Sequence, residues 1–212
     1  MNFVRYEPDA LLAKYRSLRA TVSAEQFYTK PHYRQVMEFW CAAQFARGYS
    51  EHVRRCAVLV PEGKRQSYFD FKLEAAELVR DFQLTEVMPP GRRRGDEYRR
   101  GGPARRTTSH DWDAGELLGG EWLSRAIRRK HAHYAGDVAD LDLLVYLNFL
   151  VVELQYSGLR DQAADDAASF RSVWLLSGKA IACIRSRDEE ELMARAWMFL
   201  PEEEEHRGKR ET

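Results

Sequence analysis

The stretch that most constrains the fold covers residues 66–88, with the sequence QSYFDFKLEAAELVRDFQLTEVM. It places one acid, Asp70, in an aromatic run with strand-like alternation. A second acid, Glu86, lies in another apolar run just before two prolines. A carboxylate in a buried segment costs free energy unless it is hydrogen-bonded, paired or bound to a metal. The stretch therefore predicts two strands that carry functional acids, and it indicates Asp70 and Glu86 as metal ligands.

The surrounding sequence predicts a chain in which helices and strands alternate. Apolar spacing favours helices over residues 8–23 and 31–48, the second one beginning at Pro31 and ending at Gly48, with residues 25–30 as the connector between them. The remaining elements expected are strands over 53–60, 67–73 and 82–88, a helix ending near residue 134, a strand over 141–147, a helix over 161–170, a hairpin over 173–184 and a helix over 188–200. Because a helix between two strands usually connects parallel neighbours, we expect an α/β sheet.

One part of this assignment has a competing interpretation. Residues 72–81 contain LEAAEL, a strong helix former, and no Gly, Pro or Asn that would turn a hairpin. Local propensity therefore favours a helix there as much as a hairpin between two strands. The flanking runs 67–71 and 82–87 have strand-like patterns in either case.

Composition limits the class of protein. The chain has 212 residues, 44% hydrophobic and 31% charged, with a formal net charge of zero, which is ordinary for a single globular domain over residues 1–200 with a charged tail over 201–212. Three widely spaced cysteines without a CxxC pair disfavour structural zinc and a disulfide framework. No apolar leader or uninterrupted 20-residue apolar run is present, so we expect a cytoplasmic protein without a membrane span.

An arginine- and glycine-rich segment over residues 89–111 interrupts the chain. Between residues 91 and 106 it carries seven arginines against two acids, a local charge of plus five in a neutral protein. Such a segment is either a solvated linker or a loop that contacts phosphates, because arginine binds phosphate through two parallel hydrogen bonds. The candidate phosphate-binding residues are Arg92, Arg93, Arg94, Arg99, Arg100, Arg105 and Arg106.

The order helix, strand, strand, strand, helix, strand, with acids at Glu38, Asp70 and Glu86, resembles the PD-(D/E)XK superfamily, which has the restriction-endonuclease-like fold. The resemblance covers roughly residues 31–150. It implies a mixed central sheet flanked by helices, here with an extra N-terminal helix and a C-terminal helix. It also implies Mg²⁺ or Mn²⁺ held by the three acids, Asp70 and Glu86 as the motif acids and Glu38 as the helix acid.

The chain departs from this pattern at the lysine of the motif, where Met88 stands. Lys72, on the strand face of Asp70, and Lys130, on the following helix, are the candidate substitutes. Two other placements of the motif remain open, Glu62 with Asp70 and Lys72, and Asp142 with residues 153–155. A fourth interpretation makes all of these acids surface or capping residues.

The resemblance implies a metal-dependent nuclease that cleaves phosphodiester bonds in DNA, with RNA as a further substrate class and a homodimer if both strands of a duplex are cut. The missing lysine favours an alternative, an inactive member of the fold that binds nucleic acid or a protein partner. A third hypothesis is a purely structural protein whose apolar helix over residues 31–47 packs against another subunit.

Overall fold

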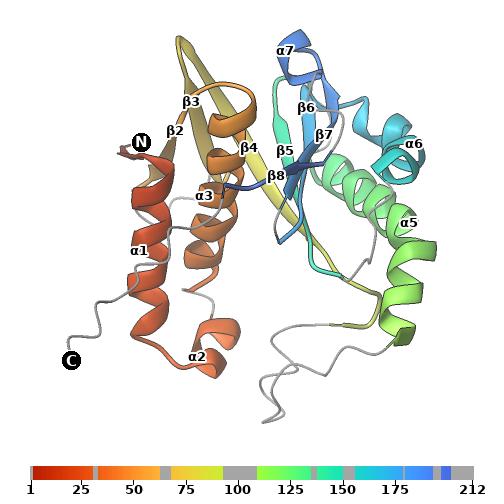
Figure 1. Ribbon diagram of the computed structural model, residues 1–212, viewed down its shortest axis with the longest axis horizontal. Helices are drawn as coiled ribbons and strands as arrows, with labels where there is room; N and C mark the ends of the chain where they lie inside the picture. Colours follow the sequence, from red (N-terminus) through yellow and green to blue (C-terminus); the bar gives the residue numbers. More distant parts are fainter. Residues whose placement is uncertain are drawn as a thin grey trace.

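A computed structural model describes residues 2–30, 33–62, 68–92, 109–134, 138–149, 156–178, 180–192 and 197–201. Figure 1 shows a twisted sheet between two layers of helices, with α1 and α3 on one face and α5 and α6 on the other. The helices are α1 Pro8–Ala20, α2 Ala24–Thr29, α3 Arg34–His52, α5 Ser109–His133, α6 Tyr156–Ala167 and α7 Glu189–Leu192. The strands are β1 Phe3–Tyr6, β2 Ala57–Pro61, β3 Phe71–Ala75, β4 Leu78–Val87, β5 Asp142–Leu147, β6 Ser172–Leu176, β7 Ala180–Ser186 and β8 Met198–Phe199. Within these segments, no helix is long and apolar enough to cross a membrane.

In the described part of the chain the strands form one eight-stranded sheet whose spatial order follows the sequence. Strands β1 to β4 pair antiparallel, β4, β5 and β6 pair parallel, and β6 to β8 pair antiparallel again. The helices α5 and α6 make the two parallel crossovers, and both pack on the same face, as two successive crossovers of one handedness require. The predicted mixed α/β sheet flanked by helices, with parallel pairing across a helix, is confirmed.

The hairpin interpretation of the ambiguous stretch is confirmed, and the helical alternative over residues 72–81 is wrong. Strands β3 and β4 pair from Phe71 and Phe82 at the open end to Ala75 and Leu78 at the turn. Helical propensity is overridden because every second residue of β3 is buried beneath α3. The two-residue turn places Ala76 at φ 53°, in the left-handed region that glycine favours.

The predicted end of the second helix at Gly48 is also wrong, because α3 continues to His52. A Cβ atom at residue 48 would lie 2.8 Å from Leu200 Cδ2 and 2.9 Å from Ile181 Cδ1. This glycine therefore permits close packing of α3 against the end of the sheet and does not terminate the helix.

Two further assignments need correction. The connector predicted over residues 25–30 contains the short helix α2, whose N-terminus is capped by the Ser23 hydroxyl, which accepts a hydrogen bond from Gln26 N at 3.2 Å. The helix predicted over residues 188–200 begins as α7, but Met198 and Phe199 pair with β7 as a strand. Edge pairing with the sheet overrides helical propensity at this end of the chain.

Candidate functional site

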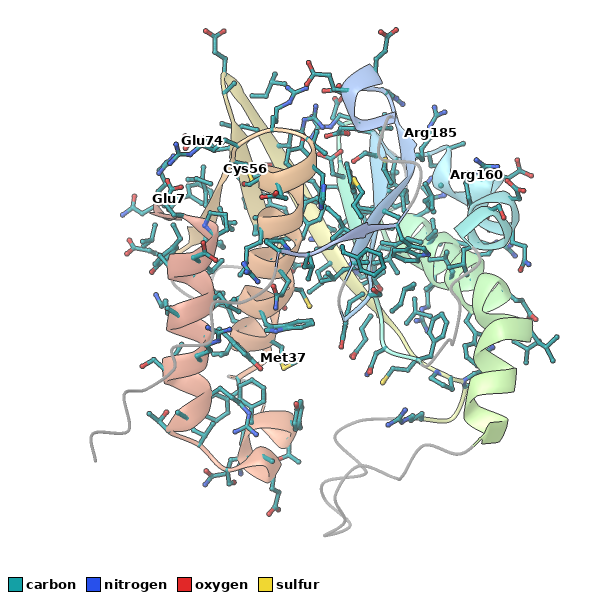
Figure 2. The ribbon with its side chains drawn as sticks, viewed as in Figure 1. Glu7, Met37, Cys56, Glu74, Arg160 and Arg185 are labelled. Carbon is teal, nitrogen blue, oxygen red and sulfur yellow. The ribbon has the colours of Figure 1, made fainter. Side chains whose placement is uncertain are left out.

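A cavity of about 410 Å³ lies beside the N-terminal half of α3, between that helix, α2 and the strands β4 and β5. Met37, which Figure 2 labels on α3, is one of its wall residues. The described residues that line it are Phe27, Tyr28, Thr29, Lys30, Met37, Glu38, Cys41, Leu84, Glu86 and Tyr146. This size and a mainly apolar wall with a few polar groups are typical of a small-molecule site.

Aromatic contacts hold the walls of the cavity in place. Phe27 is 2% exposed and stacks on Tyr33 with ring centroids 5.9 Å apart, which fixes α2 against the start of α3. On the opposite wall, Tyr146 of β5 meets the ring of Trp40 edge to face at 5.2 Å. The cavity is therefore built by packed side chains from both the helical layer and the sheet.

Two carboxylates converge on this cavity from separate elements. Glu38 lies on α3 between Met37 and Cys41, and Glu86 lies near the end of β4, where it accepts a hydrogen bond from Asn148 Nδ2 at 2.8 Å. Lys30, which is exposed, is the one cationic residue among the described residues of the wall. The structure thus brings together two of the three acids that the sequence indicated, and the described residues of the wall hold two carboxylates, of which Glu86 is exposed, against one ammonium group.

Asp70 and Lys130 are not among the described residues of the cavity wall, but both bind the backbone of a residue that is. Leu84 N donates a hydrogen bond to Asp70 Oδ2 at 2.7 Å, and Lys130 Nζ donates one to Leu84 O at 3.3 Å. Asp70 precedes β3, and Lys130 comes from α5. The third predicted acid and one of the two candidate lysines are therefore neighbours of the cavity rather than part of its wall.

The other candidate lysine, Lys72, lies elsewhere. Its ammonium group is 2.7 Å from Asp81 Oδ1 and 4.6 Å from the centre of the Phe69 ring. A smaller cavity of about 260 Å³ lies in this region, lined by Tyr68, Asp81, Tyr134, Asp140 and Leu141. Burial, together with the negative charge of Asp70, raises the pKa of Tyr134 to about 12, so its phenol stays protonated at neutral pH.

Asp142, the first acid of one alternative motif placement, is a buried residue with hydrogen-bond donors around it. Asp142 is fully buried and accepts hydrogen bonds from Arg171 Nε at 3.0 Å and from the Ser172 hydroxyl at 2.7 Å. These partners compensate the buried charge. Residues 153–155, its predicted companions, lie outside the described residues.

Several predictions concern residues that the structure does not describe or does not test. Arg92 is half-buried, whereas Arg93, Arg94, Arg99, Arg100, Arg105 and Arg106 lie outside the described residues, as does most of the tail over 201–212. In the described segments, no group of three or more His, Cys, Asp or Glu side chains is placed to hold a metal ion. Glu38 and Glu86 line the same cavity, and hard cations such as Mg²⁺ and Mn²⁺ prefer carboxylate oxygens, but the metal stays a prediction.

Sequence reasoning missed the aromatic residues that α2 contributes to the cavity. Phe27 and Tyr28 were assigned to a connector, although Ser23 and Gln26 have the spacing of a capping box, the signal that would have indicated α2. Tyr146 lies in a strand that was predicted, but its contact with α3 has no signature in the sequence.

Comparisons with known proteins give little guidance. No family model and no curated protein matches the chain. A solved structure that matches is a protein of unknown function from Pseudomonas aeruginosa strain PAO1, described as belonging to the monooxygenase superfamily. It is 15% identical, the match covers 92% of this chain and 96% of that chain, and the TM-score is 0.43. A likeness at this level assigns no activity to the present chain.

These comparisons contradict the predicted membership in the PD-(D/E)XK superfamily and the predicted DNA nuclease. The matching structure is described as a monooxygenase-superfamily protein, and the comparisons return no nuclease or DNA-binding protein. The inactive nucleic-acid-binding member of that fold gains no support either. The motif misled because two acids sixteen residues apart and a helix acid form a degenerate pattern, and its most specific member, the lysine, is replaced by Met88.

Proposed function

We propose that this protein binds a small organic molecule that combines an apolar or aromatic body with a positively charged group. The observation that carries the proposal is the convergence of Glu38 and Glu86, from a helix and a strand, on a mainly apolar cavity of about 410 Å³. Ligand sites of this kind bind by apolar burial, and a few polar groups fix the orientation of the ligand.

The charged residues that line the cavity favour a positively charged ligand. Among the described residues of the wall there are two carboxylates, the half-buried Glu38 and the exposed Glu86, and one ammonium group, that of the exposed Lys30, so a cation is favoured over an anion. A charge-assisted hydrogen bond to a carboxylate is stronger in a partly desolvated cavity than in water. The faces of Tyr28 and Tyr146 add attraction for a cation placed over them.

The body of the ligand follows from the apolar residues. Phe27, Met37 and Leu84 present carbon surface toward the cavity. Burying apolar surface against them contributes roughly 25 cal/mol for each Å² removed from water. A planar ring or short aliphatic chain is therefore favoured over a strongly polar body such as a sugar.

A titration with three matched probes tests this proposal. Phenethylamine, 2-phenylethanol and phenylacetate share a phenyl ring and differ in charge, and their binding can be measured by ligand-observed NMR and calorimetry. We expect the amine to bind most tightly and the anion least. Glu38→Gln and Glu86→Gln should each weaken amine binding roughly tenfold or more, since a hydrogen bond to a charged group contributes about 1.5–3 kcal/mol.

Glu121→Gln is the matched control, because Glu121 is an exposed carboxylate on α5 that pairs with Arg125 on the other face of the sheet. It should leave amine binding unchanged. Equal binding of the amine and the alcohol, or amine binding that survives both cavity substitutions, would contradict the proposal.

Manganese titrated into the same variants tests the predicted metal, whose binding should disappear in Glu38→Gln and Glu86→Gln.

A further inference from the structure

The backbone of Leu84 is held in an unusual way. In the described residues the β3–β4 ladder ends at the pair Phe71–Phe82, and Asp70 N adds one further hydrogen bond to Phe82 O at 2.8 Å. Leu84 is the next residue whose N–H and C=O point to this edge of β4, because these groups alternate along a strand.

Two charged side chains take the place of a neighbouring strand at this point. The Asp70 carboxylate accepts from Leu84 N at 2.7 Å, and the Lys130 ammonium group donates to Leu84 O at 3.3 Å. Both side chains belong to half-buried residues. A hydrogen bond with one charged partner is stronger than a neutral backbone pair, and partial burial reduces its screening by solvent.

Leu84 connects these two side chains to the cavity. Its own side chain and that of Glu86, two residues further along β4, line the cavity opposite α3. Displacement of the Leu84 backbone would therefore move an apolar wall group and a carboxylate together. The contact from Lys130 also links α5, on one face of the sheet, to a cavity on the other face.

We propose that Asp70 and Lys130 are positioning residues of the cavity, which fix Leu84, and through it Glu86, relative to α3. The role in ligand binding rests on the proposed function. The geometric part does not, because it can be measured without any ligand. Cys41, which is 2% exposed and lines the cavity, supplies the probe.

The experiment measures how fast a small maleimide modifies Cys41, with Cys56 and Cys183 as internal references for global opening. All three cysteines are free and buried, and peptide mass spectrometry separates them. The variants are Asp70→Ala, Asp70→Asn and Lys130→Met, each also titrated with phenethylamine. The control Lys72→Met breaks the ion pair with Asp81 and touches no described residue of the cavity wall.

We expect Asp70→Ala and Lys130→Met to change the Cys41 rate at least threefold relative to Cys183, and to weaken phenethylamine binding at least fivefold. Asp70→Asn should restore both quantities, because the amide oxygen still accepts from Leu84 N. Lys72→Met should change neither. A Cys41 rate that follows Cys183 in every variant would overturn the positioning role. If wild-type protein binds no phenethylamine, the proposed function fails and the labelling rates alone decide the inference.

Discussion

At the scale of single residues, the least expected side chain is Glu191. Glu191 belongs to the run of acids at the start of α7, where acids favour helix formation, yet it is fully buried. Its carboxylate accepts hydrogen bonds from the Tyr49 hydroxyl at 2.7 Å, the Ser186 hydroxyl at 2.5 Å and the Arg80 guanidinium. Burial raises the pKa of both Glu191 and Tyr49. This one carboxylate thus connects α3, β4 and β7 to α7.

Substitution of Glu191 tests how much this hydrogen-bond network contributes to the free energy of unfolding. We expect Glu191→Ala to lower the free energy of unfolding by about 3–5 kcal/mol, because it leaves the buried Arg80 charge without one of its partners. Glu191→Gln should cost less, because the amide oxygen still accepts from Tyr49 or Ser186, whereas Arg80 keeps Asp188 at 2.6 Å in both variants. Urea unfolding of the three proteins measures the difference. Equal stability of wild type and Glu191→Ala would show that the contacts contribute nothing net.

At the scale of elements, the β3–β4 hairpin forms against its local preference. Its turn has Ala76 in the left-handed region, where a Cβ atom costs roughly 1–2 kcal/mol. The strands form nonetheless because their alternate side chains enter the core, with Phe71 and Phe82 stacked at 5.1 Å. Tertiary burial therefore outweighs both the helical propensity of the segment and the strain of its turn.

This strain gives a prediction for the turn. Ala76→Gly should raise the free energy of unfolding by about 0.5–1 kcal/mol, since the relief of the left-handed strain exceeds the extra chain entropy that glycine adds to the unfolded state. Thermal and urea unfolding would measure it. The control is Ala126→Gly, at a buried position inside α5, which should destabilise. A turn variant less stable than wild type would argue against the described turn conformation.

At the scale of the whole molecule, one sheet separates two cores. Neighbouring residues on β5 enter different ones, because Leu144 packs against the α1 and α3 layer and Leu143 packs against the α5 and α6 layer. Both side chains are fully buried. Since β4, β5, β6 and β7 contribute side chains to both cores, the predicted single domain over residues 1–200 implies that the two cores unfold together.

Cavity-forming substitutions on the two faces test this cooperativity. Leu143→Ala and Leu144→Ala should each lower the free energy of unfolding by about 2–5 kcal/mol. Each variant should still show a single transition that coincides by tryptophan fluorescence and far-ultraviolet circular dichroism. If one variant instead separates into two transitions, the layers fold as independent units and the single-domain prediction is wrong.

The sequence by itself determined the order of the major elements, because helical and strand periodicities are local properties of the chain. Alternation of apolar and polar residues indicated strands in the regions of β3 and β4, and a continuous apolar run indicated β5. The helix expected between β4 and β5 predicted their parallel pairing. The sequence also singled out Glu38 and Glu86 because they lie in apolar segments, although the structure leaves Glu38 half-buried and Glu86 exposed. It did not separate a hairpin from a helix over residues 72–81, where propensity and burial disagree.

The tertiary structure decided what those local signals could not. It placed Glu38 and Glu86 on one cavity and Asp70 beside it, because which strand edges and helix faces meet depends on contacts between residues far apart in the chain. It showed that Gly48 permits close helix–sheet packing and does not end a helix. It also showed that Glu191 is buried among its hydrogen-bond donors. The degenerate acid motif predicted a nuclease, but the proposed site is defined by the residues around these acids, which include aromatic side chains from α2 and β5.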